Sequence, residues 1–323
     1  MRFLLVLIAI IATGSGWTPA FAAEGSSAAG PLGGTDMRSA QLPPPGLYGG
    51  SMHVYAEANE FFDGDGKAVP ALKGLDLRRM RHGPFIAYVP NVEILGGSIG
   101  LLGLLPVGTE CGRLFTTTSK SCIHGVGDAY VELTWSRFFG SVRPSQFANA
   151  YPVLQGLTVA AGVGVVVPTG RYKAETAQSQ GVLIGNNLWD IAPNVAFTYM
   201  TRPIFFDGTE VSAKAYLNNY GENPDTDYKT GSLVNIDFAL TERIGRVQLG
   251  LAGFYAFQVA DDELRGVPVP PDGARGKVLH LGGVIAYDMP ERGTSLKVKA
   301  LTSAVTDNAV HSSALLMGWI KKF

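Results

Sequence analysis

The sequence predicts an all-β fold, an outer-membrane antiparallel β-barrel of about 12 strands that follows a cleaved signal peptide. Three observations lead to this prediction. The chain begins with an export signal, its middle consists of alternating segments whose connecting loops sort by length, and its last strand is apolar on one face and ends on an aromatic residue.

The first 22 residues have the three parts of a secretory signal peptide. Arg2 supplies the positive charge, residues 3–12 form the apolar run, and Ala20-Phe21-Ala22 is an A-x-A cleavage site. The longest nearly apolar run elsewhere, residues 94–107, contains glycines and is shorter than the roughly 18 residues that a membrane helix needs. The sequence therefore predicts export without a helical membrane anchor.

Residues 23–46 are rich in Gly, Ala, Ser and Pro and end with Pro43-Pro44-Pro45. This composition is typical of a flexible linker that a short polyproline segment stiffens. The alternative is that part of the segment enters the barrel as a small plug.

Composition supports many short strands and turns. The 323 residues include 41 Gly and 19 Pro, and 16% of them are charged, with a formal net charge of -1. A chain without an excess of basic residues has no electrostatic attraction for nucleic acid, which we exclude as a partner.

Strands are expected where apolar residues alternate with small or polar ones. In residues 246–259, Leu249, Leu251 and Phe257 share one face while Gln248 and Gly250 take the other. The expected strands cover residues 47–59, 79–92, 94–106, 127–138, 154–167, 188–200, 209–220, 229–240, 246–259, 276–288, 294–303 and 313–323. Residues 47–323 therefore form the barrel.

Loop lengths distinguish a membrane barrel from a β-sandwich, which alternates in the same way. Long connections such as residues 107–126 and 168–187 follow the odd-numbered strands, whereas short turns such as residues 241–245 follow the even-numbered ones. Residues 139–153 are the exception, because they are long where a short turn is expected. Short turns at one end and long loops at the other are typical of outer-membrane barrels.

One set of polar side chains falls on the predicted lumen face by parity: Asp128, Glu132, Asp190, Asn194, Lys214, Asn218, Asn235, Asp237, Gln248 and His280. They form either a hydrogen-bonded filling or the lining of a narrow pore or ligand site. Ala160, Gly162 and Gly164 on the same face are expected to leave room for passage. Phe254 is the candidate for ring contact with a solute.

Asp261 and Asp262 follow an aromatic strand at its extracellular end and are expected at the mouth of the barrel. With Glu263 they have the carboxylate oxygens that a hard cation prefers, but a solvated loop explains them as well. We therefore assign no metal and no cofactor.

Cys111 and Cys122 are expected to form one disulfide in the second extracellular loop, because the chain matures in an oxidising compartment. A metal site is the alternative, although His124 is the only further ligand nearby in sequence.

Enzymatic motifs are absent from the sequence: it has no G-x-S-x-G elbow, H-E-x-x-H helix or Walker loop. His311, Ser312 and Ser313 adjoin one another, but neighbouring residues of a strand point to opposite sides. We assign no catalytic residues and expect that the protein is not an enzyme.

The last ten residues form a strand with Leu315, Met317, Trp319 and Phe323 on one face. This ending resembles the C-terminal signature of outer-membrane barrels that the barrel-assembly machinery reads. Lys321 departs from the pattern, but its ammonium can reach the lipid headgroups.

Several motifs resemble a known family. They are G-V-G-D (125–128), L-T-W (133–135), V-V-P-T-G-R-Y (166–172), N-N-L-W-D-I-A-P-N-V-A-F-T-Y (186–199), T-D-Y-K-T-G (226–231) and F-Q-V-A-D-D (257–262). Together they are similar to the phenol-degradation meta-pathway transporter family, which includes SphA-like outer-membrane proteins.

The resemblance implies a passive channel for small hydrophobic or aromatic compounds in the outer membrane of a Gram-negative bacterium. The remaining alternatives are a barrel with a structural or adhesive role and, as the weakest, a lipid-modifying enzyme.

Overall fold

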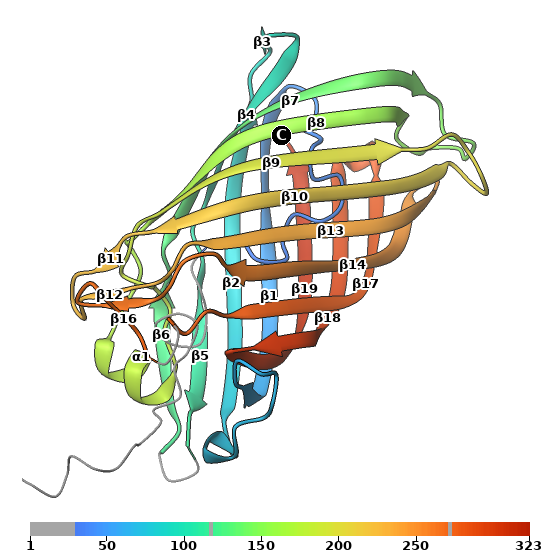
Figure 1. The fold of residues 1–323 in the computed structure, drawn as a ribbon. Coiled ribbons are helices and arrows are strands. Elements are labelled where there is room, and N and C mark those ends of the chain that lie inside the picture. Colours follow the sequence, from blue (N-terminus) through green and yellow to red (C-terminus); the bar gives the residue numbers. More distant parts are fainter. Residues whose placement is uncertain (1–29, 116–118, 271–272) are drawn as a thin grey trace, which may run out of the picture.

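A computed structural model describes residues 30–115, 119–270 and 273–323. The predicted signal peptide, residues 1–22, lies outside this part of the chain. The strands form a closed antiparallel barrel of 12 strands, as predicted (Figure 1). Ser51 of the first strand is paired with Trp319 of the last, and this pairing closes the ring.

The strands of the wall are β1 (Gly46–Phe62), β2 (Asp76–Val89), β4 (Gly97–Leu104), β7 (Ala129–Arg143), β8 (Val153–Val167), β9 (Asp190–Met200), β10 (Gly208–Tyr220), β13 (Leu233–Ile244), β14 (Val247–Gln258), β17 (Lys277–Met289), β18 (Thr294–Asp307) and β19 (Ala309–Lys322). Each matches one of the predicted strands, with boundaries that differ by a few residues. The agreement follows from the side-chain alternation, which both the sequence and the closed sheet must obey.

The remaining elements are short. They are β3 (Glu93–Ile94), β5 (Val107–Arg113), β6 (Ser121–Val126), β11 (Glu222–Asn223), β12 (Tyr228–Lys229), β15 (Glu263–Leu264), β16 (Val267–Pro268), α1 (Ala174–Gln180), η1 (Pro70–Leu72) and η2 (Pro290–Arg292). In the described part of the chain, no helix is long and apolar enough to cross a membrane.

Burial alternates along the strands, most regularly in β9. In β9 every even-numbered residue is buried and every odd-numbered one is exposed. The exposed side chains are apolar and include Leu251, Trp189 and Trp319. A barrel with an apolar outer face and a polar interior is the arrangement that lipid on the outside requires. Lys321 is exposed as well, and its ammonium lies 5.9 Å from the Phe323 ring.

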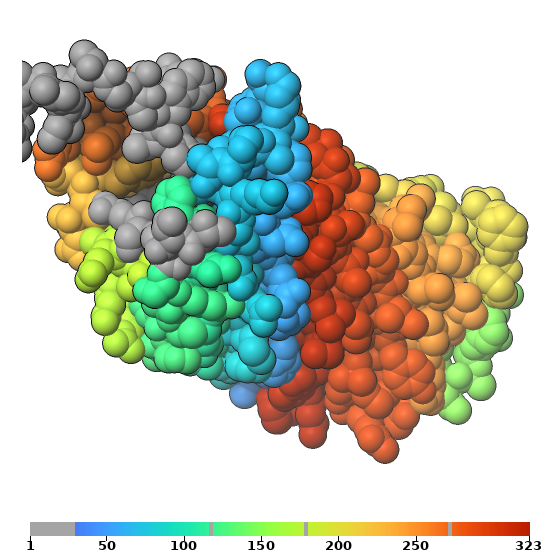
Figure 2. Space-filling view, turned by 90° about the horizontal axis from the view of Figure 1, so that it is seen from below, coloured from blue at the N-terminus to red at the C-terminus, as the bar shows by residue number. Residues whose placement is uncertain are grey.

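The third predicted strand, residues 94–106, ends early, and residues 107–126, which were expected to be a loop, contain two further strands. β4 ends at Leu104, and the chain continues beyond Pro106 as β5, because proline has no N–H to donate to a sheet. Both pieces pair with β2, but β4 pairs on its other side with β7 whereas β5 pairs with β6. The green β5–β6 hairpin therefore leaves the ring beside the blue β1 and β2 strands (Figure 2).

Residues 168–189 pack where the hairpin and β7 diverge. Asp128 holds them, because its carboxylate accepts hydrogen bonds from the amides of Gly170 (2.8 Å) and Asn186 (2.6 Å). Val182 and Ile184 pack into the apolar cluster behind β1 and β2. Asp128, predicted on the lumen face, thus acts from the junction between β6 and β7.

Cys111 and Cys122 are directly opposite each other in the β5–β6 hairpin and form a disulfide. The predicted pairing is correct, but the cysteines belong to paired strands rather than to an irregular loop. Closing so short a loop stabilises the fold by at most about 3 kcal/mol, and by less here because the ladder already joins the two strands.

Mass analysis tests the disulfide in the purified protein. Alkylation without reductant is expected to leave both cysteines unmodified, and reduction of the disulfide should expose two thiols that can be alkylated. Two modified cysteines in the unreduced sample would contradict the disulfide. The Cys111→Ser, Cys122→Ser double variant should still form the barrel, because the hairpin lies outside the ring of twelve strands.

The loops at the extracellular end add a small sheet of β11, β12, β15 and β16. Asp262 links this sheet to the end of β14, because it accepts hydrogen bonds from the Tyr228 hydroxyl (2.5 Å), the Gly231 amide (2.6 Å) and the Gln258 side chain (2.5 Å). Burial raises the pKa of the Asp262 carboxyl to about 6.

Candidate functional site

Residues 30–45 lie inside the barrel, where Figure 1 shows them as a blue trace enclosed by the strands. This differs from the flexible linker expected from composition. Asp237 on β13 accepts hydrogen bonds from the amides of Gly33 (2.9 Å) and Thr35 (2.8 Å) and from the Thr35 hydroxyl (2.8 Å). We refer to residues 30–45 as the lumen segment.

Asp36 forms the most deeply buried charge contact of the lumen segment. Its carboxylate lies 2.6 Å from the Lys299 ammonium and 3.0 Å from that of Lys297, and Asp36 and Lys299 are almost completely inaccessible to solvent. The Lys299 ammonium also donates to the Gly33 carbonyl. Each buried charge is therefore neutralised and hydrogen-bonded, as burial of charge requires.

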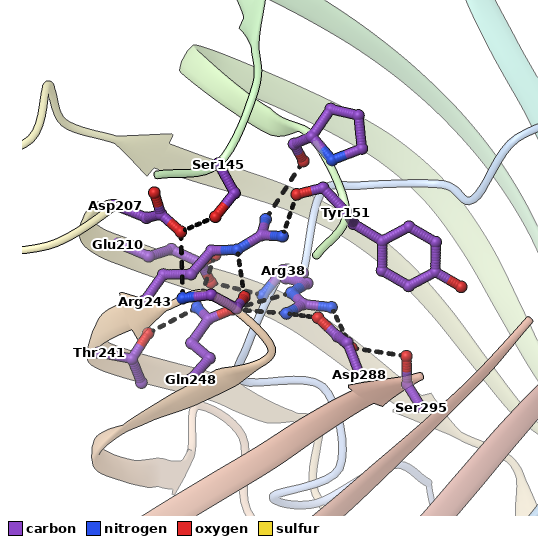
Figure 3. A network of polar contacts seen from close by, with 12 residues as sticks. Arg38, Ser145, Tyr151, Asp207, Glu210, Thr241, Arg243, Gln248, Asp288 and Ser295 are labelled. Atoms are coloured by element: carbon purple, nitrogen blue, oxygen red, sulfur yellow. Dashed lines mark hydrogen bonds and ion pairs between the residues drawn. The ribbon is translucent and has the colours of Figure 1, made fainter. Parts of the chain in front are cut away.

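Arg38 joins the segment to three strands near the periplasmic end (Figure 3). Its guanidinium makes a two-pronged contact with Asp288 (2.7 and 3.1 Å) and donates to the Gln248 oxygen (2.7 Å), while its amide donates to Glu210 (2.7 Å). Arg243 lies beside this network and donates to the Tyr151 carbonyl (2.7 Å). Parity placed Gln248 in the lumen, but its arginine partner comes from the N-terminal segment.

The small lumen residues of β8 do not leave an open path. Ala160 packs against Ala40 of the lumen segment and Ala196. A Cβ on Gly164 would lie 2.3 Å from the Tyr130 hydroxyl, so this ring already fills the space. The expectation that Ala160, Gly162 and Gly164 leave room is therefore wrong, because side chains of other elements occupy that volume.

A cavity of about 240 Å³ remains in the extracellular half of the lumen. Leu32 and Gly33 of the lumen segment line it together with Val54, Leu233 and Val278, among other apolar residues. The segment thus forms part of the wall of a compartment whose lining is mainly aliphatic.

Phe254 and His280 lie side by side in the wall of this cavity. Their rings are stacked, with centroids 4.5 Å apart and an angle of 10° between the planes. His280 Nε2 lies 2.9 Å from the Ser312 hydroxyl and 3.0 Å from that of Ser303, whereas its buried Nδ1 has no hydrogen-bond partner. The sequence placed Phe254 and His280 on one face, and the pairing of β14 with β17 brings them into contact.

Gly33 makes this arrangement possible. Its φ is +67°, and a Cβ there would lie 2.7 Å from the Phe254 ring. Only glycine combines a left-handed backbone with so close an approach.

Glu132 and Lys214 form an ion pair across the lumen, from β7 to β10. The Tyr130 hydroxyl (2.5 Å) and the Thr134 hydroxyl (2.7 Å) also donate to Glu132. Asn194 is buried nearby and donates to the Ala192 carbonyl (3.3 Å). These predicted residues therefore serve as a hydrogen-bonded filling.

The sequence analysis did not identify a second group of charged residues, which contains one glutamate and two arginines. Glu110 on β5 is buried between Arg79 (2.7 Å) and Arg81 (3.0 Å) on β2, and all but Arg81 line the cavity. The equal parity of Arg79 and Arg81 indicated that both side chains point to the same face. Their partner Glu110 could not be predicted, because residues 107–126 were expected to be a loop.

Asp261 and Asp262, which were predicted at the extracellular mouth, follow the end of β14. Asp261 forms an ion pair with Arg275 (2.6 Å), and Glu263 lies 4.0 Å from Lys229. Because hydrogen bonds also occupy Asp262, these carboxylates do not converge on a common point for a cation.

The His311, Ser312 and Ser313 group is divided by the wall. Ser312 points inward to His280, while Ser313 lies on the other face and bonds with Thr302 (2.9 Å). His311 packs against Phe62. His280 contacts two serines, but no acidic side chain orients its Nδ1 within the described residues, so they hold no Ser-His-Asp constellation at this point.

Comparison with known proteins agrees with the fold. The sequence profile of a family described as "Putative MetA-pathway of phenol degradation" matches residues 58–314. No functionally curated protein matches by sequence.

Among solved structures, an outer membrane channel from Pseudomonas putida F1 superposes with a TM-score of 0.72 at 13% identity, covering 91% of this chain and 100% of that one. The β-domain of the Bordetella autotransporter BrkA matches with a TM-score of 0.49 at 10% identity, over 86% and 99% of the two chains. The TodX monoaromatic hydrocarbon channel gives 0.42 at 10% identity, over 94% and 98%. The first likeness shows a shared fold, and scores below 0.5 add nothing to it.

Proposed function

The chain belongs to this phenol-degradation family, and from that premise we propose that it is an outer-membrane channel for the passive uptake of small hydrophobic or aromatic compounds. The protein is placed in the outer membrane of a Gram-negative bacterium, and the terminal strand is its contact with the assembly machinery. Its solutes are bound without a cofactor, and we assign it no reaction.

The observation that supports this function best is the apolar cavity that the lumen segment helps to line. Its apolar lining favours solutes that leave water for an aliphatic and aromatic surface. The charged groups beneath it are paired with one another, so the lumen does not offer the continuous polar path of a wide aqueous pore.

Phe254 is the residue expected to contact the solute. It presents a ring whose position is fixed by Gly33 on one side and by His280 on the other.

Phe254→Ala is expected to lower the uptake of a radiolabelled aromatic at limiting concentration by roughly 2- to 10-fold, because one aromatic contact is worth roughly 0.5 to 1.5 kcal/mol. Phe257→Ala is the matched control, since this ring lies on the outer face of the same strand against Tyr255. The wild type and a deletion strain complete the comparison.

Unchanged uptake in the deletion strain across a broad panel of hydrophobic solutes would refute transport. The structural or adhesive role would then be preferred, provided that the protein inserts in the membrane. Equal losses in the Phe254 and Phe257 variants would show that the defect lies in the barrel and not in the cavity.

A further inference from the structure

Asp190 at the start of β9 is a buried carboxylate without a cationic partner. It is completely inaccessible to solvent, and neither of its oxygens accepts a hydrogen bond of normal geometry, although the Asn219 backbone amide lies near it. Asp36, Asp237 and Asp288, the comparable carboxylates of the lumen, each have two or more donors. Within the described residues, Asp190 is the only acidic side chain with buried oxygens left in this way.

A second orphan acceptor lies next to it. Asn218 on β10 is also fully buried, and its Oδ1 accepts no hydrogen bond, while its Nδ2 donates to the Leu233 carbonyl (3.3 Å). Both acceptors adjoin Gly30: a Cβ on this glycine would lie 2.7 Å from Asn218 Oδ1 and 3.0 Å from Asp190 Oδ2. The two oxygens therefore lie close to each other at the N-terminal end of the lumen segment.

Asn235 on β13 adds a third oxygen of the same kind. Its Nδ2 is committed to the Pro31 carbonyl (3.0 Å) and to Asp237 (2.9 Å), so its buried and unpartnered Oδ1 forms the other end of the amide. Pro31 follows Gly30 directly. Asn235 therefore contacts the lumen segment at Pro31 through its amide nitrogen, and its oxygen is left without a hydrogen-bond partner.

Leaving these groups unpaired is costly, because a buried carboxylate loses its hydration and gains nothing in return. No cation among the residues that the structure describes offsets the charge: Lys214, the basic residue on the lumen face of β10, is bound to Glu132. A carboxylate beside amide oxygens, without a cationic side chain to neutralise it, is the ligand type that hard metal cations prefer over soft ones.

We propose that Asp190, Asn218 and Asn235 bind a hard divalent cation of the Ca²⁺ type beside Gly30. The bound ion neutralises Asp190 and satisfies the amide oxygens. It fixes the outer end of the lumen segment and, through it, Leu32 in the cavity floor. The site does not depend on which solute the barrel carries.

Titration of the purified full-length protein in detergent with Tb³⁺, a luminescent substitute for Ca²⁺, tests the site. Tyr220, directly opposite Asp190, and Trp189 are close enough to sensitise the emission. We expect one saturable site that Ca²⁺ displaces, with a dissociation constant of roughly 10⁻⁴ to 10⁻³ M because a single carboxylate takes part.

Asp190→Asn keeps the size of the side chain and should lower the affinity at least tenfold, and Asn218→Leu should lower it as well. Asp225→Asn, in an exposed extracellular turn, is the matched control and should bind like the wild type. Heat modifiability on gels verifies that each variant forms the barrel.

A wild-type protein that shows no saturable, Ca²⁺-displaceable emission would overturn the proposal, because Asp190 would then be neutralised by a proton alone. Emission that persists unchanged in Asp190→Asn would overturn it too, since the ion would be bound elsewhere. The wild-type titration decides the first point even if a variant fails to fold.

Discussion

Replacing Asp36 with alanine is expected to release the lumen segment and to raise the single-channel conductance of the barrel severalfold. The substitution leaves the Lys299 ammonium buried without its counter-charge, which costs roughly 3 to 5 kcal/mol when one partner of a buried pair is removed. The segment is not part of the twelve-stranded wall. We therefore expect the lost free energy to weaken the binding of the segment inside the lumen and not the stability of the barrel.

Conductance recordings on purified protein in planar bilayers measure this effect. Asp65→Ala is the matched control, because Asp65 forms only an exposed ion pair with Lys67 outside the barrel. Protease accessibility of residues 30–45 gives a second readout. A variant with wild-type conductance and a protected segment would show that Asp36 does not hold the segment in place.

Leu251→Arg is expected to destabilise the inserted barrel by roughly 2 to 4 kcal/mol, because the side chain faces lipid and an arginine near the bilayer midplane is costly. Leu251 is 68% exposed on the outer face of β14, and its pairing partner Leu240 is also exposed and apolar. Unfolding in urea from lipid vesicles, followed by the gel shift between boiled and unboiled samples, measures the loss.

Val267→Arg is the control for this experiment. Val267 is 64% exposed, close to Leu251, but it belongs to β16 in the extracellular sheet. The neighbouring Gly250 cannot serve as a lumen-facing control for Leu251, because a Cβ there would lie 2.2 Å from the Leu240 carbonyl oxygen. Equal stability of the Leu251 variant and the wild type would contradict the assignment of this face to lipid.

Heat modifiability of the wild-type protein is the premise of both experiments. Barrels keep their hydrogen-bonded ring in cold detergent, because closing the sheet leaves no free edge.

The disposition of the wall was predictable because it rests on local rules. Alternation along residues 246–259 assigned Gln248 and Leu251 to opposite faces, and the pairing of β14 with its neighbours keeps them there. The β5–β6 hairpin was not predicted, because residues 107–126 were expected to be a loop and the pairing of β5 with β2 is a contact between distant parts of the chain.

The lumen contacts show the boundary between sequence and structure most clearly. Parity alone placed Asp237 and Gln248 on the lumen face, but their partners Thr35 and Arg38 lie more than 200 residues away in a segment that reads as a linker. The further partners of Asp36 and Arg38 in the wall, Lys299, Glu210 and Asp288, were not among the predicted residues. The charged residues 36 and 38 in that glycine-rich stretch were the only available signal.

The sequence by itself determined the class of fold, the number of strands, the face of each side chain and the disulfide, because these follow from the two-residue period of a strand and from short-range spacing. Only the tertiary structure decided what fills the barrel. The curvature of the closed sheet brings side chains from distant strands together. Charged side chains on the inner face of the wall then pair with the charged residues of the lumen segment. For this reason the cavity, the stacked rings and the orphan carboxylate of Asp190 emerged only once the ring was closed.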